Sequence, residues 1–324
     1  MCVAVPFFVA SVALASAHLS SIWCARLLVE VKIGEKMDVG DAAAVVDARI
    51  KLSIGTEQSG NADGQFRYAR GLVFDIHRGL LLVVDSNNHR VQVFSCDDGC
   101  SFVYKLGEGG LEPGQLQRPD GIAIDHDHDR ILISDTGNNR VQLWSLSNQS
   151  FLSCAGHLGA RGSAFNTPYG IAIDKHHHRI IIVDTFNNRL VFLSSIDLSF
   201  LFSVGGNQGE FHYPIGIAID EDRHRIIVSD TYNDRMQVLS SIDGSFLFEF
   251  GSQGDQPGQF KNPQGLCIAN QGRIIVADCY NYRLQSFTPE GHHISSFDCH
   301  NEGPFGVAFD EHRGLIAFSA GHRV

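Results

Sequence analysis

Residues 209–251 read GEFHYPIGIAIDEDRHRIIVSDTYNDRMQVLSSIDGSFLFEFG, which is four short apolar segments separated by polar turns. Segments rich in β-branched and aromatic residues are typical of strands, and we predict them at 217–220, 225–229, 236–240 and 246–251. Pro214 is expected to hold Tyr213 in an extended conformation, and Gly216 to permit a tight turn into the first strand. The stretch therefore predicts one small antiparallel sheet with strands a to d in chain order.

The same pattern recurs along the chain, and the glycine before strand a falls at Gly71, Gly121, Gly170, Gly216, Gly265 and Gly306. A period of 41 to 50 residues with strands inside each copy indicates a radial array of small sheets. Strands a and b are almost continuously apolar, as expected of sheets buried on both faces. Because no copy shows a long stretch with helical spacing, we predict an all-β fold, a six-bladed β-propeller of four-stranded antiparallel blades.

Five copies also share an Asp at the end of strand b, followed by Asn at the third position and Arg at the fifth. The Asp and Arg residues are Asp85 and Arg90, Asp135 and Arg140, Asp184 and Arg189, Asp230 and Arg235, and Asp278 and Arg283. On these residues and the glycines, residues 50–324 resemble the NHL-repeat family, whose six-repeat members form six-bladed propellers. The resemblance implies a domain like those that select substrates or RNA for tripartite-motif ubiquitin ligases. This sequence differs from those proteins in showing no RING, B-box or coiled coil.

Repetition favours a structural role for the charged residues. A residue needed once for chemistry has no reason to recur in every blade, whereas a buried ion pair that ties the b–c loop to the next strand is needed in each. The apolar residue near the start of each copy is likewise expected to pack between blades. This residue is Phe66, Leu116, Phe165, Phe211 or Phe260.

The sixth copy is incomplete. Pro304, Gly306 and Asp310 are in place, but Ala320 stands where strand b of the other copies ends in Asp, and the sequence stops at Val324. An open last blade would leave strand hydrogen bonds unpaired. We therefore predict that N-terminal segments complete it, with 26–34 as strand c and 49–55 as strand d.

Composition allows one large β domain, which we place at 26–324. The net charge of −11 disfavours an extensive phosphate-binding surface but leaves a local basic face open.

The eight cysteines contain no C-x-x-C pair, so no zinc module is predicted. Cys96 and Cys100 either form a disulfide across a hairpin turn or remain free thiols. We predict no cofactor, no metal site and a monomeric propeller.

Residues 1–25 form a hydrophobic N-terminal segment. Ala15, Ser16 and Ala17 have the small-x-small form of a signal-peptidase site, but a positively charged segment before them is missing. The segment is a cleaved signal, an uncleaved membrane anchor or an unrelated extension. The sequence accordingly leaves cytoplasmic, secreted and membrane-anchored locations open.

Binding is expected where the copies differ. The turns before strand a and the b–c loops lie at one end of the wheel, because successive strands reverse direction, and we call this end the top face. Its variable positions are rich in aromatic residues, which could bind a ligand or merely cover the mouth of the channel. The candidate binding residues are Arg70, Asn87, Asp120, Tyr169, Phe186, Tyr232, Gln264, Tyr280 and Phe305. The same turns also contain Arg67, Arg118, Arg161 and Lys261, which make this end less acidic than the whole chain.

The opposite end is rich in histidine. The a–b turns contain His77, His126, His128, His176, His177, His178, His224 and His312. Clustered imidazoles can bind transition metals or respond to pH, but solvated turn residues are the favoured interpretation because no acidic or Cys partner stands at metal-site spacing.

Three functions remain open. The favoured one is a non-catalytic binding scaffold whose top face holds a protein segment or single-stranded RNA, as a substrate-recognition module in a ubiquitin-ligase pathway. The first alternative is a secreted enzyme, because propellers resembling this one include peptidyl-amidating lyases and lactonases. Their metal sites need inward-facing ligands, and strand a contains no His in any copy, so no catalytic residue is assigned. The second alternative is an extracellular sensor domain.

Overall fold

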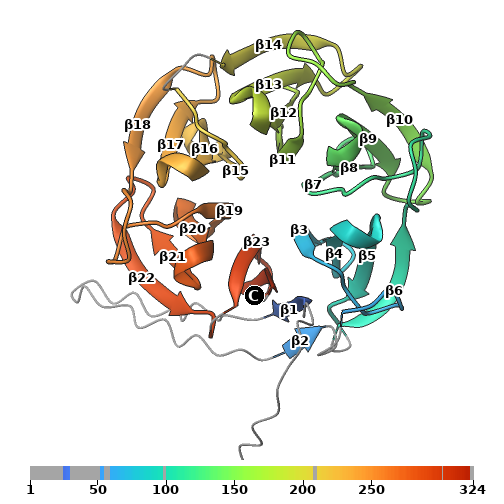
Figure 1. The fold of residues 1–324 in the computed structure, drawn as a ribbon, viewed down its shortest axis with the longest axis horizontal. Coiled ribbons are helices and arrows are strands. Elements are labelled where there is room, and N and C mark those ends of the chain that lie inside the picture. The colour runs from blue at the N-terminus through green and yellow to red at the C-terminus, as the bar shows by residue number, and fades with distance from the viewer. Residues whose placement is uncertain are drawn as a thin grey trace, which may run out of the picture.

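A computed structural model of the chain describes residues 25–29, 52–54, 59–97, 100–206, 210–300 and 302–321. Within these residues, four-stranded antiparallel sheets stand around a common axis as the blades of a propeller (Figure 1). Five blades are each built from one continuous stretch of the sequence, and we number them 1 to 5 along the chain. A further sheet, in the order β2-β1-β24-β23, joins the two ends of the described chain, and we call it the composite blade.

The strands have the following bounds, taken from blade 1 to blade 5 and ending with the composite blade. The innermost strands a are β3 (Ala69–Asp75), β7 (Ile122–Asp125), β11 (Pro168–Asp174), β15 (Ile217–Asp220), β19 (Pro263–Ala269) and β23 (Gly303–Asp310). Strands b are β4 (Leu80–Asp85), β8 (Arg130–Asp135), β12 (Arg179–Asp184), β16 (Arg225–Asp230), β20 (Arg273–Asp278) and β24 (Leu315–Gly321). Strands c are β5 (Arg90–Ser95), β9 (Arg140–Ser145), β13 (Arg189–Ser194), β17 (Arg235–Ser240), β21 (Arg283–Phe287) and β1 (Ala25–Val29). The outermost strands d are β6 (Ser101–Leu106), β10 (Phe151–Ala155), β14 (Phe200–Gly205), β18 (Phe246–Phe250), β22 (His293–Asp298) and β2 (Leu52–Ile54).

The predicted all-β propeller of four-stranded antiparallel blades is confirmed, and the strands expected within 209–251 correspond to β15 to β18. The sixth sequence copy is not a blade by itself, since it supplies only β23 and β24. β1 pairs with β24, and β2 pairs with β1, so N-terminal segments provide the outer half of the composite blade. The remaining parts of the predicted strands, at 30–34, 49–51 and 55, lie outside the described residues.

The pairing register shows that β1 is equivalent to strand c of the other blades. In blade 2, Asp135 at the end of strand b stands opposite Arg140 at the start of strand c, and the same pairing occurs in the other four continuous blades. In the composite blade, Arg26 takes the register position of that arginine, opposite Ala320. The composite blade thus keeps the arginine of the repeat and lacks its aspartate.

Apolar side chains fill the space between neighbouring blades. Leu116, at the start of the second copy, is fully buried in a cluster with Val91 of blade 1 and Ile131 of blade 2. The equivalent residues Phe66, Phe165, Phe211 and Phe260 are buried as well, as predicted. Burial of such large side chains, at roughly 25 cal/mol per Å² of apolar surface, is the main attraction between blades.

Each copy needs its glycine for a different reason from the one that we predicted. Gly216 does not have a positive φ, so it is not needed for a tight turn. A Cβ atom built on it would lie 2.3 Å from the carbonyl oxygen of Gln264 in the next blade. The same close approach, at 2.3 to 2.5 Å, recurs around the ring, and Gly306 faces the carbonyl of Arg70. The glycines therefore allow the innermost strands to pack backbone against backbone.

The expectation that Tyr213 is extended is wrong. Tyr213 has a φ of 57°, in the left-handed region. Its N–H donates a hydrogen bond of 2.8 Å to the side-chain Oδ1 of Asn188 in the preceding blade. Thr167 and Asn262 take the same conformation and donate to Asn139 and Asp234. A link between blades thus overrides the local preference of a residue that precedes proline.

The buried Asp and Arg pair also makes a different connection from the one predicted. Asp135 Oδ2 accepts from Arg140 Nε at 2.7 Å, and Arg140 Nη1 and Nη2 donate to the carbonyls of Leu111 and Glu112. Asp135 Oδ1 accepts from the backbone N–H of Gln117 at 2.6 Å. The pair therefore ties the b–c loop to the turn before strand a of the same blade, rather than to the next strand.

Candidate functional site

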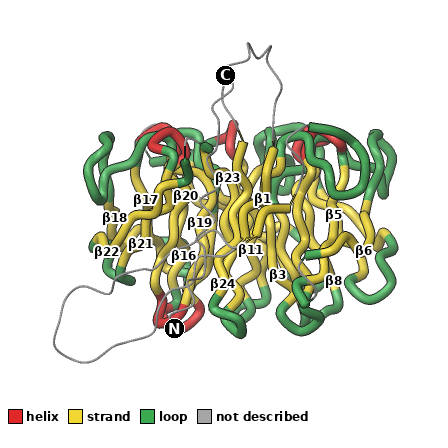
Figure 2. Tube along the Cα trace, turned by 90° about the horizontal axis from the view of Figure 1, so that it is seen from below, coloured by secondary structure: helices red, strands yellow, loops and turns green. Residues whose placement is uncertain are grey.

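The top face carries the b–c loops and the turns before strand a. In blades 1 to 5 each b–c loop is a short 3-10 helix, and such helices lie along the upper edge of the wheel in Figure 2. They are η1 (Ser86–Asn88), η2 (Thr136–Asn138), η3 (Thr185–Asn187), η5 (Thr231–Asn233) and η7 (Cys279–Asn281). The middle residue of each helix donates its N–H to a carbonyl in the turn before strand a, as Phe186 does to Asn166 at 3.1 Å. This contact holds the two sets of variable positions side by side.

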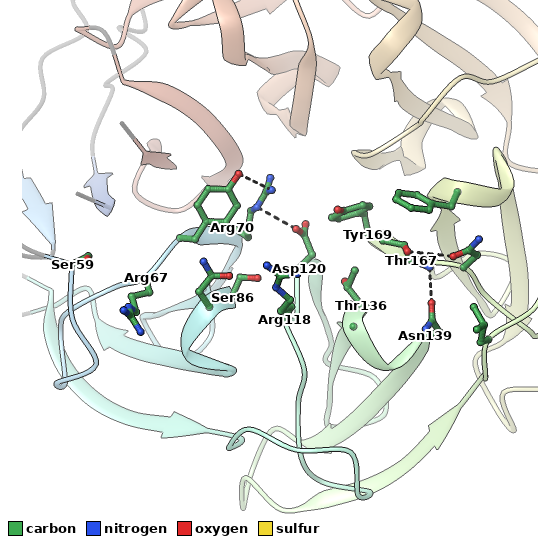
Figure 3. Close-up of a pocket in the computed structure, with 16 residues that line it drawn as sticks. Ser59, Arg67, Arg70, Ser86, Arg118, Asp120, Thr136, Asn139, Thr167 and Tyr169 are labelled. Atoms are coloured by element: carbon green, nitrogen blue, oxygen red, sulfur yellow. Dashed lines mark hydrogen bonds and ion pairs between the residues drawn. The ribbon is translucent and has the colours of Figure 1, made fainter. Parts of the chain in front are cut away.

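The top face is hollowed over blades 1 to 3. The cavity has a volume of about 930 Å³, and Figure 3 shows the side chains that line it. Arg67 and Arg70 come from the turn and strand of blade 1, Arg118 and Asp120 from the turn of blade 2, and Tyr169 from blade 3. This volume lies within the range of about 300–1,000 Å³ that is usual for sites of small ligands.

Arg70 crosses the mouth of the central channel. Its Nε lies 3.4 Å from Asp120 Oδ2 (Figure 3), and its Nη1 donates to Gln264 Oε1 at 3.2 Å across the ring. The guanidinium carbon also lies 4.2 Å from the ring centre of Tyr68 and 4.5 Å from that of Phe305. A guanidinium group packed against aromatic rings and a carboxylate in this way is held in one orientation.

Burial changes the protonation of the groups around Arg70. Desolvation raises the pKa of Asp120 to about 6, against the opposing effect of the Arg70 charge. Desolvation, followed by the Asp120 charge, raises the pKa of Tyr169 to about 12. The channel below is narrow, at about 90 Å³, and its walls include Ile122, Ile171 and other apolar side chains of strands a. Asp120 is therefore a carboxyl that titrates close to neutral pH beside a cavity.

Aromatic rings form a ladder beside the cavity, over blades 3 and 4. Phe186 and Tyr213 have ring centres 4.8 Å apart, and Tyr213 stacks on Tyr232 with centres 4.5 Å apart and planes inclined by 8°. Tyr232 also contacts His212 edge-on at 5.4 Å. Because Phe186 is 46% exposed and Tyr232 is 52% exposed, the ladder presents apolar surface to solvent.

Comparison with protein families matches the NHL repeat at residues 66–94, 116–143, 211–239 and 260–287. Each match runs from the buried apolar residue before strand a into strand c. The chain carries NHL repeats.

Two further comparisons agree with the NHL-repeat propeller. A stretch of 41 residues, 13% of this chain, is 46% identical to the E3 ubiquitin-protein ligase TRIM32 of Homo sapiens, and the match spans only 6% of that protein. A gluconolactonase from Xanthomonas campestris superposes with a TM-score of 0.60 and 15% identity over 81% of this chain and 88% of its own. An inactive variant of virginiamycin B lyase from Staphylococcus aureus, solved with quinupristin, gives a TM-score of 0.55 and 16% identity over 78% of each chain. At these identities the two structures share the fold alone.

The NHL-repeat propeller divides the candidate binding residues among several places. Arg70, Asn87, Asp120, Tyr169 and Phe186 line the cavity. Gln264 and Phe305 line the narrow channel below, together with Arg70 and Asp120. Tyr232 belongs to the aromatic ladder. Tyr280 is half-buried on blade 5 and does not line the cavity.

Several lining residues were not among the candidates. Tyr68, Arg118 and Thr167 all line the cavity, and each has a positive φ. Each stands directly before the position that holds proline in most copies. Leu158 is 67% exposed and comes from the loop that leads into blade 3. The sequence signal that marks the first three is the variability of the residue before the proline position.

Some histidines of the a–b turns contact the buried Asp at the end of strand a. His128 Nδ1 lies 2.9 Å from Asp125 Oδ2, and His177 Nδ1 lies 2.9 Å from Asp174 Oδ2. In blade 1 the same position relative to Asp75 holds Arg78. These two histidines thus stand where other blades place an arginine beside the buried Asp at the end of strand a.

The structure also bears on three other predictions, which concern metal binding, the membrane and disulfides. Among the described residues, no group of three or more His, Cys, Asp or Glu side chains is placed to hold a metal ion. No helix in the described part is long and apolar enough to cross a membrane. Residues 1–24 lie outside it, so the signal or anchor stays a prediction. Cys96 and Cys100 are half-buried thiols that are not joined in a disulfide.

Proposed function

We propose that this NHL-repeat propeller is a binding scaffold that holds a protein segment on its top face. The observation that carries the proposal is the cavity of about 930 Å³ over blades 1 to 3. Its walls come from positions that differ between copies, whereas the repeated Asp and Arg residues are used in loop contacts. Variable loops on a rigid scaffold are common binding surfaces.

Exposed aromatic and aliphatic groups support a macromolecular partner. Phe186 is 46% exposed and Leu158 is 67% exposed, and both line the cavity. Aromatic side chains supply large contact areas at low entropic cost, which is why they are enriched in binding sites. Single-stranded RNA is the alternative partner of the same surface, because bases stack on exposed rings.

A place in a ubiquitin-ligase pathway is part of the proposal. The support is the stretch of 41 residues at 46% identity to a protein named as an E3 ubiquitin-protein ligase. The propeller would then select the substrate to which the ligase transfers ubiquitin.

Photo-cross-linking tests the binding function. Benzoylphenylalanine placed at Phe186 is expected to cross-link partners in living cells, and the same group at Phe246 is not. Phe246 is a matched control because it is 55% exposed and lies on the outer strand β18, outside the lining of the cavity. Protease-sensitive adducts at position 186 support a protein partner, and nuclease-sensitive adducts support RNA. Equal adducts at both positions, or none, would contradict the proposal.

An enzyme is the second candidate, and Asp120 is the observation that favours it. A carboxyl with a pKa of about 6 beside a cavity is suited to general acid or base chemistry. The gluconolactonase that shares the fold indicates lactones as substrates to test. Lactone hydrolysis that is lost in Asp120→Asn would favour the enzyme over the scaffold.

A further inference from the structure

The charge of the cavity is opposite to that of the chain. Arg67, Arg70 and Arg118 line it, and Asp120 is its acidic lining residue. The whole chain, in contrast, has a net charge of −11. Arg67 and Arg118 are exposed, so their side chains are available to a ligand at the rim. A cationic hollow on an acidic protein attracts an anionic partner.

Arg70 offers this partner a prepared anchor at the bottom of the cavity. The rings of Tyr68 and Phe305 pack on the guanidinium, and its Nη2 donates to the Tyr68 hydroxyl at 3.1 Å. Because Nη1 donates to Gln264, the Nε edge is the one that faces Asp120. The Nε to Oδ2 distance of 3.4 Å is longer than the roughly 2.7–2.9 Å of a charge-assisted hydrogen bond. Asp120 therefore holds this edge loosely, and another carboxylate could make a closer pair.

We propose that the cavity binds an acidic protein segment, one carboxylate of which replaces Asp120 at the Arg70 guanidinium. The inference rests on the proposed binding function and assigns the chemistry of the partner. Further acidic residues of the segment pair with Arg67 and Arg118 at the rim. An apolar or aromatic residue of the segment packs on Phe186 and Leu158, which border the same cavity.

The geometry favours a carboxylate over a nucleic-acid backbone. A strand of nucleic acid needs a track of cations that follows its phosphates. Here a single guanidinium lies deep in the cavity, and the neighbouring walls include polar uncharged residues such as Asn139 and Thr136. This arrangement suits one buried anion among polar uncharged neighbours.

The proposal implies that binding takes up a proton. A second carboxylate at Arg70 would lie beside Asp120, and repulsion between two like charges favours protonation of Asp120. Arg70 and Tyr169 interact electrostatically with Asp120, and Arg118 lines the same cavity. Tyr68, Tyr169 and Cys279 interact electrostatically with Arg70. Burial raises the pKa of Asp120 to about 6. Affinity should therefore rise by about fivefold as the pH falls from 7.5 to 6.5.

Fluorescence polarisation of labelled peptides on the full chain tests this. The probes are fluorescein-GGEFEYE with a free C-terminus, the same peptide as its C-terminal amide, a version with Gln for every Glu and an amide end, and an eight-nucleotide oligouridylate. The acidic peptides are expected to bind, and to bind more tightly at lower pH. Loss of binding on amidation would assign the anchor to a C-terminal carboxylate, and equal binding would assign it to an acidic side chain; both outcomes support the proposal.

Variants separate the roles of the cavity residues. Arg70→Gln and the exposed Arg118→Gln should each weaken the acidic peptide at least fivefold. Asp120→Asn should strengthen it at pH 7.5 and abolish the pH dependence. Asp222→Asn, on the exposed turn η4 (Glu221–Arg223) at the opposite end, is the matched control and should change nothing. Thermal melts establish that each variant is folded, and Arg118→Gln serves if Arg70→Gln is not.

Each contrary outcome has a separate meaning. If the Gln peptide binds as tightly as the acidic ones and depends on Phe186, the acidic partner is wrong and the binding scaffold stands. If the oligouridylate binds more tightly than every peptide through the same arginines, the partner is RNA and this inference is wrong. If no probe binds and position 186 gives no cross-links, both proposals are wrong.

Discussion

Gly306 and Arg70 are separated by most of the chain, yet a Cβ atom on Gly306 would lie only 2.4 Å from the Arg70 carbonyl oxygen. The contact joins the composite blade to blade 1. Ser319 of the composite blade reinforces it, because its hydroxyl donates to the same Arg70 carbonyl at 2.6 Å. The residue that anchors the candidate ligand is therefore held by the contact that closes the ring.

Substitution of this glycine should open the contact. Gly306→Ala forces the two backbones apart and is expected to lower the free energy of unfolding by about 1–3 kcal/mol. Gly109→Ala is the control, because the atoms nearest to its added Cβ belong to the His89 side chain, at 3.2 Å or more. Urea denaturation measures both. Equal stability of the two variants would show that the close approach at Gly306 relaxes without cost.

The composite blade should depend on residues far from its other half in sequence. Deletion of 24–55 removes β1 and β2 and leaves β24 with an unpaired edge. We expect a lower melting temperature and a broader transition, since neighbouring blades lose their packing in turn. Deletion of 1–23 keeps both strands and is the control. A sharp, unshifted melt after removal of 24–55 would contradict the role of β1.

Much of the fold could be predicted because its signals repeat. The Asp, Asn and Arg of each copy have fixed spacing, and the register of the Asp and Arg is the same in five blades. The conformation of Tyr213 could not be predicted, because it depends on the side chain of Asn188 in another blade. The function of Gly216 was missed for the same reason, since the atom it must avoid belongs to Gln264.

The candidate site was predictable in place but not in shape. The variable positions of the top face were identified, yet the cavity forms over only three blades. Asn87 and Gly137 are small and leave space over blades 1 and 2, whereas the rings of Phe186 and Tyr232 stack with Tyr213 over blades 3 and 4. The reach of Arg70 across the channel to Gln264 follows from ring closure and is not visible in any one copy.

Loss of one buried carboxylate should be costly. Asp135→Ala leaves the Arg140 guanidinium in place without its carboxylate partner, and we expect a loss of about 3–5 kcal/mol of stability. Asp255→Ala is the control, because Asp255 is exposed in the loop before blade 5. Chemical denaturation compares the two. A loss below about 1 kcal/mol at Asp135 would show that the pair is not needed to hold the turn before strand a.

Acid should weaken the contact between blades 1 and 2 at the histidine-rich end. The rings of His77 and His126 meet edge-on with centres 4.4 Å apart. Burial, with the nearby charges of His77, Lys175 and Arg78, lowers the pKa of His126, although Asp75 opposes this. The unfolded chain, with an ordinary His pKa of about 6.5, then binds protons more readily than the folded one. The contribution of His126 to stability should therefore be complete above a pH of about 6.5 and fall as the pH drops below it.

Replacement of His126 isolates this effect. His126→Gln removes the titrating group, so its melting temperature should fall less between about pH 7.5 and pH 5.5 than that of the unchanged chain. His312→Gln is the control, because His312 is an exposed residue in an a–b turn of the composite blade. Melting curves across this pH range measure all three proteins. If His126→Gln loses as much stability in acid as the unchanged chain, the acid sensitivity arises at another group, because the variant keeps His77 but lacks the imidazole of His126.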